Sequence, residues 1–267
     1  MAVSLRAMVD DVRASAIPTS SSLPRGRVVL AVARIEAWQM LRHPSFPLTI
    51  AFGLLLFRGA IGIGWGGGSM LNLAWLFGGV AVGSLIGAVL TSNVAALRGR
   101  RDHLLELFGS LPSPPEARTA GVLAGIVLGL GSLSVVIGAL AWLVLERTAD
   151  MAAGADLFLA VQYPLSLLAL ASLGVAVARW IPSVLGGPLV VVAHVFTGLI
   201  WVVPWIATTE SGIGVAWHLL YLMALIVAFS AIAFLRDRRT MVRGAVAATM
   251  FAVAVLAAVQ QTPPGGY

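Results

Sequence analysis

Long apolar runs, separated by short polar segments, set the pattern of this chain. A helix needs about 20 mostly apolar residues to cross about 30 Å of hydrocarbon. The pattern therefore predicts an all-α polytopic membrane protein with six to seven transmembrane helices, because the last run reaches only about 24 Å as a helix. The expected transmembrane domain covers residues 47–259, with spans at about 47–64, 71–96, 120–144, 157–178, 184–205, 215–235 and 244–259.

A polar tail and an amphipathic segment precede the first span. Residues 1–26 contain no apolar signal core, so we expect a polar cytoplasmic tail rather than a cleaved leader. Residues 27–46 predict an N-terminal interfacial helix, which lies flat at the membrane surface with its tryptophan at headgroup depth and its arginines near lipid phosphates. The side chains expected at that surface are Arg34, Ile35, Trp38 and Arg42.

Composition supports this class and narrows the chemistry. The 267 residues are 59% hydrophobic and 10% charged, whereas soluble domains carry about 25% charged residues. There is no cysteine, and all 17 basic residues are arginine. A Walker loop and a Schiff-base enzyme both need lysine. Any ATP that drives this protein must therefore be bound by another polypeptide.

The arginines also predict an orientation. All of them except Arg58 and Arg147 precede the first span or fall in the alternate loops on the same side of the membrane. Positive loops face the cytoplasm, so we expect a cytoplasmic N-terminus. Residues 260–267 then form a short external tail if the seventh apolar run crosses.

The predicted spans contain few groups that carry chemistry. No acidic residue lies within them, which argues against a proton-driven carrier, since such carriers keep a proton-binding group in the bilayer. Arg58 and His194 are candidates for a substrate path, although Arg58 can also snorkel to the surface and His194 can bond a neighbouring helix. His194 and His218 differ in depth by roughly 11 Å, which excludes a shared metal or haem. No protease or hydrolase motif is present, so we expect no catalytic residues.

Two rows of glycines at four-residue spacing mark helix contacts. Rows of small residues let helix backbones approach closely in a membrane. They serve either packing within one chain, or a dimer contact or sliding surface. The rows are Gly79, Gly83 and Gly87 in the second span and Gly121, Gly125 and Gly129 in the third.

A second amphipathic segment, residues 97–119, connects the second and third spans. Its apolar residues share one face at helical spacing, and that face either docks into a partner's groove or rests on the membrane. The apolar face consists of Leu104, Leu107, Phe108 and Leu111, and the charged residues beside it are Arg100, Arg101, Asp102 and Glu106.

This segment resembles the permease subunits of type 2 ABC exporters. In many of them the second span leads into a cytoplasmic stretch that ends Leu-Glu-Leu-Leu-Leu-Ser-Leu-Pro, and residues 105–112 here read Leu-Glu-Leu-Phe-Gly-Ser-Leu-Pro. The helix before the first span and the arginine-rich run before the last are also similar. His103-Leu104 and Pro114-Pro115 depart from the usual Gly-Thr and basic residues, and the family commonly has six spans.

The resemblance implies an all-helical permease in the bacterial plasma membrane, present as two copies or a homologous pair. It also implies that residues 100–111 form a coupling helix held by a separate ABC ATPase, with Glu106 meeting a basic residue there. ATP and Mg²⁺ would bind that ATPase, so we expect no cofactor or metal on this chain and no nucleic-acid partner. Apolar, glycine-rich walls favour a hydrophobic or amphipathic substrate. The alternatives are a non-transporting membrane assembly or sensor protein and a secondary carrier.

Overall fold

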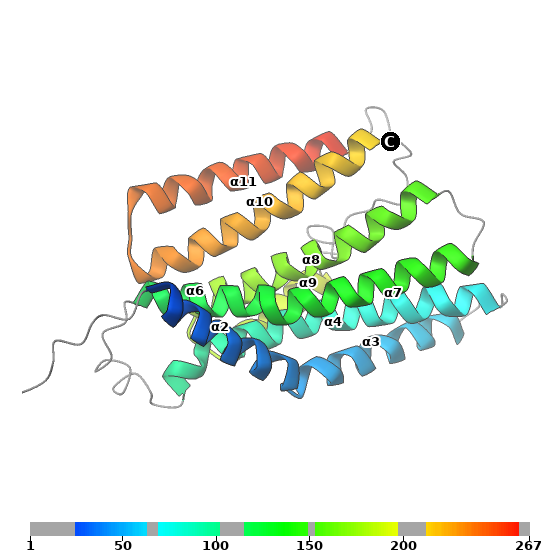
Figure 1. Cartoon of the computed structure of the whole chain (residues 1–267), viewed down its shortest axis with the longest axis horizontal. Coiled ribbons are helices and arrows are strands. Elements are labelled where there is room, and N and C mark those ends of the chain that lie inside the picture. The colour runs from blue at the N-terminus through cyan, green and yellow to red at the C-terminus, as the bar shows by residue number, and fades with distance from the viewer. Residues whose placement is uncertain (1–24, 63–68, 102–114, 149–152, 197–211, 262–267) are drawn as a thin grey trace, which may run out of the picture.

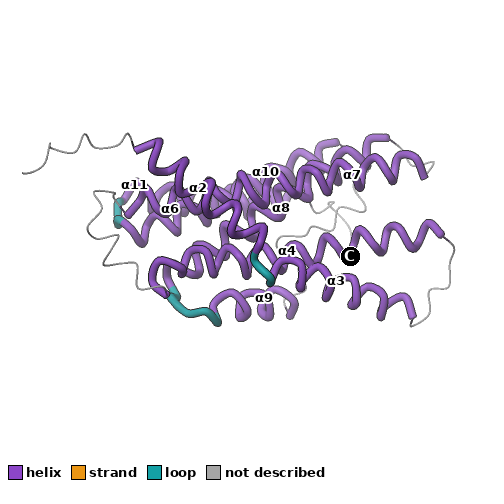
Figure 2. Tube along the Cα trace, turned by 60° about the horizontal axis from the view of Figure 1, so that its bottom comes forward, coloured by secondary structure: helices purple, strands orange, loops and turns teal. Residues whose placement is uncertain are grey.

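The computed structural model describes residues 25–62, 69–101, 115–148, 153–196 and 212–261, and every element within these ranges is a helix (Figure 1). The helices form an elongated bundle that runs along the long axis of the molecule (Figures 1 and 2). They are α2 (Arg25–Arg42), α3 (Ser45–Gly62), α4 (Ser69–Arg101), α6 (Pro115–Ile126), η1 (Val127–Gly131), α7 (Ser132–Thr148), α8 (Ala153–Trp180), α9 (Gly186–Phe196), α10 (Gly212–Asp237) and α11 (Met241–Gln261).

Five helical segments in the described ranges are long and apolar enough to cross a membrane. They coincide with the second, third, fourth, sixth and seventh predicted spans, which confirms a multi-pass helical protein. The first predicted span corresponds to α3, whose Ser45–Leu56 part is a shorter apolar helix. The fifth begins as α9, and its residues 197–205 lie outside the described ranges. The five segments are Gly78–Arg98, Glu116–Leu143, Val161–Trp180, Gly214–Asp237 and Met241–Gln261.

Helices α3 and α4 pack backbone to backbone because glycines face the contact. A Cβ atom on Gly83 would lie 2.3 Å from the carbonyl oxygen of Thr49, and one on Gly53 would lie 2.3 Å from the carbonyl oxygen of Gly79. Gly87 faces the Thr49 side chain one turn further along. Only hydrogen fits at these positions, so the two helices gain dispersion contacts along this stretch.

Helix α2 packs alongside α6 and η1 through the second glycine row. Residue numbers rise together along the contact, so α2 and α6 run in the same direction. Both rows of predicted packing glycines thus contact neighbouring helices of the same chain. The contacts in this second row pair Gly121 with Val32, Gly125 with Ala33 and Gly129 with Ala37.

Helix α8 lies at the centre of the bundle, where α4, α7 and α10 all pack against it. Gly174 lets α4 approach, since a Cβ atom there would lie 2.2 Å from the hydroxyl oxygen of Ser92. The hydroxyls of Ser84 and Tyr163 form a hydrogen bond of 2.6 Å between the same two helices. Asn93 Nδ2 in α4 also donates to the carbonyl of Gly174 at 3.5 Å. Small side chains and these two hydrogen bonds therefore fix α4 against α8.

Helices α10 and α11 form an antiparallel hairpin at one side of the bundle (Figure 1). At its open end, His218 Nδ1 lies 3.1 Å from Gln261 Oε1, and Gln261 Nε2 donates to the carbonyl of Trp217. The end of α11 therefore lies beside the start of α10, at the opposite end of the hairpin from Asp237.

The third predicted span is helical throughout but changes type in its middle. Helix α6 passes into the π-helix η1, and α7 continues from it. A π-helix inserts an extra residue into the ladder of backbone hydrogen bonds. Within η1, Gly129, Leu130 and Gly131 are buried, and Gly129 faces α2. The insertion rotates the side chains of α7 relative to those of α6.

Candidate functional site at the arginine-rich end of the bundle

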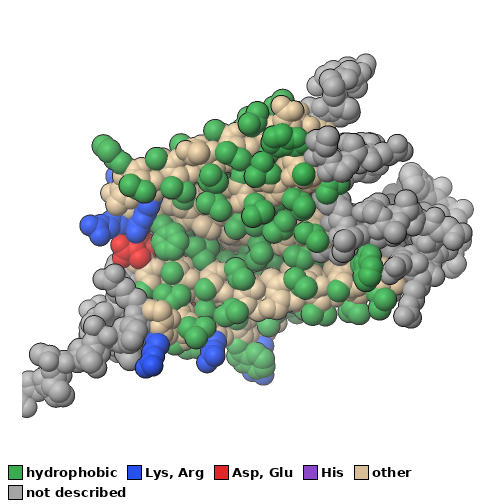
Figure 3. Space-filling model, turned by 45° about the horizontal axis from the view of Figure 1, so that its top comes forward, with side chains coloured by type: hydrophobic (Ala, Val, Ile, Leu, Met, Phe, Trp, Pro, Cys, Tyr) green, Lys and Arg blue, Asp and Glu red, His purple; other side chains and the backbone are tan. Residues whose placement is uncertain are grey.

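Charged side chains gather at one end of the bundle and along one adjoining edge, while the rest of the face visible in Figure 3 is largely hydrophobic. This is the end at which α4, α8 and α10 finish and α6 and α11 begin. It corresponds to the side that the arginine pattern predicts to be cytoplasmic. The described charged residues of α4, α6, α8, α10 and α11 there are Arg98, Arg118, Arg179, Arg236, Arg238, Arg239 and Arg243, with Glu116 and Asp237, and Glu36 of α2 pairs with Arg98 among them.

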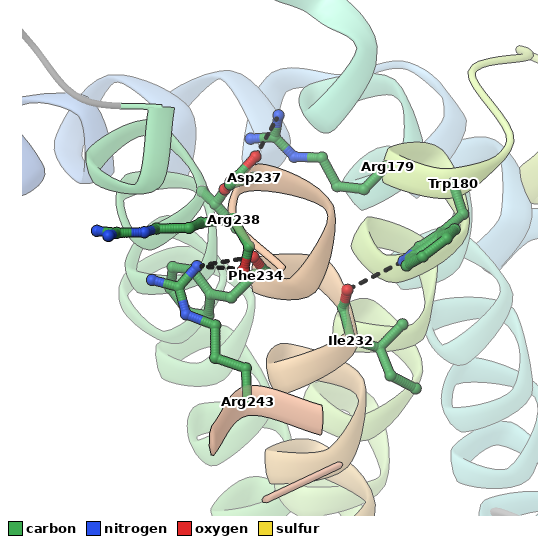
Figure 4. A network of polar contacts seen from close by, with 8 residues as sticks. Arg179, Trp180, Ile232, Phe234, Asp237, Arg238 and Arg243 are labelled. Carbon is green, nitrogen blue, oxygen red and sulfur yellow. Dashed lines mark hydrogen bonds and ion pairs between the residues drawn. The ribbon is translucent and has the colours of Figure 1, made fainter. Parts of the chain in front are cut away.

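Asp237, the last residue of α10, joins three helices. Its side chain is 5% exposed, and its Oδ1 lies 3.7 Å from Nη1 of Arg179 in α8 (Figure 4). Its Oδ2 accepts a hydrogen bond from the hydroxyl of Thr119 in α6. Nearby, the indole of Trp180 donates to the carbonyl of Ile232 at 3.0 Å. A carboxylate this deeply buried is stable only when it is paired, so Asp237 holds α6, α8 and α10 in register.

Arg243, in the first turn of α11, ties the hairpin to α6. Its Nη2 lies 3.7 Å from Oε1 of Glu116. Its Nη1 donates to the carbonyls of Phe234 at 2.9 Å and Arg238 at 3.1 Å (Figure 4). The Phe234 carbonyl lies in the last turn of α10 and also accepts the backbone N–H of Arg238, which directly follows the helix. The guanidinium therefore caps the end of α10 while it pairs with α6.

A third ion pair joins α2 to α4. Nη1 of Arg98 donates to Oε2 of Glu36 at 2.7 Å, a short charge-assisted hydrogen bond. Helix α4 ends three residues later at Arg101, and α6 resumes at Pro115, next to the Glu116 pair. The connection between α4 and α6 thus begins and ends on helices that ion pairs fasten to their neighbours.

The predicted functional residues fall into three groups. Asp102, Leu104, Glu106, Leu107, Phe108 and Leu111 lie outside the described residues, and Arg100 and Arg101 are the last residues of α4, with side chains that are not described. Arg58 in α3 and His194 in α9 lie on helices, again without described side chains. Arg34, Ile35, Trp38 and Arg42 are all exposed on α2.

Sequence reasoning did not foresee the paired carboxylates. Asp237 stands inside the run Arg236, Arg238 and Arg239, and Glu36 is the single acid of α2. An acid inside a basic run is a signal that it has a structural partner. The partners themselves, far away in sequence, carried no signal.

The described residues of this end form ties between helices. Among them there is no group of three histidine, cysteine or acidic side chains that could hold a metal ion. The ion pairs and the Thr119–Asp237 hydrogen bond link α4 to α2, and α6 to α10 and α11, while Arg179 links α8 to α10. No protein family, curated protein or solved structure matches this chain.

Proposed function

We propose that this chain is the membrane-spanning permease subunit of an ATP-driven exporter. In this proposal a separate ABC ATPase holds residues 100–111 and binds the ATP and Mg²⁺. The observation that carries the proposal is that the amphipathic segment with Glu106 and Leu111-Pro112 connects α4 and α6 at the arginine-rich end. A cytoplasmic ATPase would contact this segment on the side of the membrane where the positive loops gather.

The ion pairs would link the segment held by that ATPase to the membrane-spanning helices. When two ATPases close on ATP, they push on the coupling segments of two permease copies. Helix α4 carries α3 with it through their glycine contact, and α6 carries α2 through the second row. The substrate is hydrophobic or amphipathic and moves outward, and the assembly sits in the bacterial plasma membrane with its N-terminus inside.

Copurification tests the proposal directly. The tagged chain, expressed in its own host, should retain an ATPase that carries nucleotide-binding motifs through detergent purification. Glu106→Arg should abolish this retention and export while leaving membrane insertion intact, because like charges then meet at the docking site. Glu146→Arg, the same change near the far end of α7, is the matched control and should retain the ATPase.

Two results would reject the proposal in favour of the alternatives. A purified chain that retains a different partner through the same segment, with no ATPase, is an assembly or sensor protein. Transport that continues without any ATPase and collapses with the proton gradient identifies a secondary carrier.

A further inference from the structure

One face of α2 is exposed over the whole helix. The opposite face is buried, with Ala33, Ala37 and Met40 at most 9% exposed. The exposed face alternates arginines with large apolar groups, and Trp38 and Ile35 are each 57% exposed. Its residues, called here the arginine face, are Arg27, Leu30, Arg34, Ile35, Trp38, Leu41 and Arg42.

The arginine face carries positive charge that no described carboxylate neutralises. Glu36 is the single acid of α2, and it pairs with Arg98. None of the ion pairs between described residues involves the three arginines of the face. The guanidinium of Arg42 lies over the ring of Trp38, 4.0 Å from its centre. Figure 3 shows arginines spaced among hydrophobic side chains along the edge of the molecule.

The arginine face lies beside an apolar part of the bundle rather than beyond its end. Glu36 in α2 pairs with Arg98 of α4. Phe46, four residues after the end of α2, packs against Gly87 of the same helix α4. The distance along α4 from Arg98 to Gly87 is about 16 Å, and this stretch belongs to the candidate span Gly78–Arg98. Placing an arginine side chain in hydrocarbon costs free energy. Polar groups from the surroundings must therefore reach this side of the bundle and contact the arginines.

We propose that the arginine face binds the headgroups of anionic phospholipids, which follow α2 inward along the bundle as far as Arg42. Guanidinium groups bind phosphate oxygens in bidentate fashion, and indole rings prefer the boundary between headgroups and acyl chains. The hydrocarbon on this flank then begins at α3, whose described residues Leu48, Phe52, Leu55 and Leu56 are exposed and apolar.

The mixture of side chains favours a lipid over a protein partner. Each arginine has a large apolar neighbour on the same face, which suits a ligand with a phosphate next to an acyl chain. Beside α2, Val127 and Leu128 of η1 are also exposed and apolar, so the acyl chains have a surface to lie on. This proposal does not depend on the export function.

Lipid retention measures the proposed binding. The purified full chain is reconstituted in nanodiscs of equal phosphatidylglycerol and phosphatidylcholine, and its retained lipids are counted by native mass spectrometry. Arg34→Gln/Arg42→Gln should lower the ratio of bound phosphatidylglycerol to phosphatidylcholine roughly 25-fold at low salt, since each arginine near an anionic surface contributes about fivefold. Arg34→Lys/Arg42→Lys keeps the charge and should keep most of the preference.

A second pair of arginines distinguishes this face from charge in general. Arg236→Gln/Arg239→Gln removes two exposed arginines at the end of the bundle and should change the ratio far less. An equal loss with this control, or an unchanged ratio in Arg34→Gln/Arg42→Gln, would overturn the proposal. So would conversion of a dimer to a monomer by Arg34→Gln/Arg42→Gln with lipid retention intact, because the occupant would then be a second copy of the chain.

Discussion

Three carboxylates hold the arginine-rich end together, and they differ in burial. The side chains of Glu36 and Glu116 are 14% and 27% exposed, whereas that of Asp237 is 5% exposed. Solvent-exposed ion pairs contribute at most about 1 kcal/mol, but removing one partner of a buried pair costs about 3–5 kcal/mol. At the residue scale, Asp237 therefore provides most of the tie between helices.

We predict that Asp237→Ala lowers the free energy of unfolding by about 3 kcal/mol, because Arg179 loses its acid and Thr119 loses its acceptor. Thermal unfolding of the purified protein in detergent measures the loss. Arg238→Ala removes an exposed neighbouring side chain and should change stability by less than about 0.5 kcal/mol.

A double-mutant cycle assigns that loss to the contact itself. Because Asp237 and Arg179 touch, the combined variant Asp237→Ala/Arg179→Ala should lose less stability than the two single losses added together. Strict additivity would show that the ion pair does not couple α8 to α10.

At the scale of elements, glycine rows join helices in closely packed pairs. The α3–α4 contact and the α2–α6 contact both place glycine against a neighbouring helix. Each row thus fastens a helix of the N-terminal part to one side of the α4–α6 connection. In the proposed mechanism, a push on that connection would therefore move two pairs of helices rather than two single ones.

We predict that Gly83→Ala destabilises the protein by about 1–3 kcal/mol, because its Cβ atom would meet the backbone of α3 at 2.3 Å. The matched control is Gly244→Ala in α11, where a Cβ atom meets nothing within 4 Å and helix propensity improves. Thermal unfolding of both variants, side by side, measures the difference. Equal stability of the two would mean that α3 and α4 are not in backbone contact.

The elements themselves could largely be predicted from the sequence, but their partners could not. A long apolar run leaves few structures other than a membrane helix, so α4, α8, α10 and α11 follow from hydropathy. The π-helix at Val127–Gly131 has no comparable signal, because glycines alone mark contacts and turns as well. The depth of α2 along α4 depends on which glycine meets which side chain, and only the folded chain determines that.

At the scale of the whole molecule, the described charges outside α2 are separated from most of the apolar surface, because they lie at the end of the bundle where α4, α8 and α10 finish, while the arginines of α2 extend along one flank. The far end of the α10–α11 hairpin, where α11 ends beside the start of α10, lies opposite this charged end. Counting arginines along the sequence predicted this separation, since charges that face one compartment recur in alternate loops. The partners in the pairs Arg98–Glu36 and Thr119–Asp237 lie 62 and 118 residues apart in sequence. These pairs could not be predicted, because other residues of the chain offer the same charges and hydrogen-bonding groups.

The most direct test of the proposed function is the location of the connection between α4 and α6. The chain has no cysteine, so Ser110→Cys introduces a single reactive thiol into the coupling segment without a competing background. A membrane-impermeant maleimide should label it in inside-out vesicles and leave it unlabelled in intact cells, and the bound ATPase should slow the labelling. Labelling of Ser110→Cys from outside intact cells would contradict the proposed coupling and the orientation together.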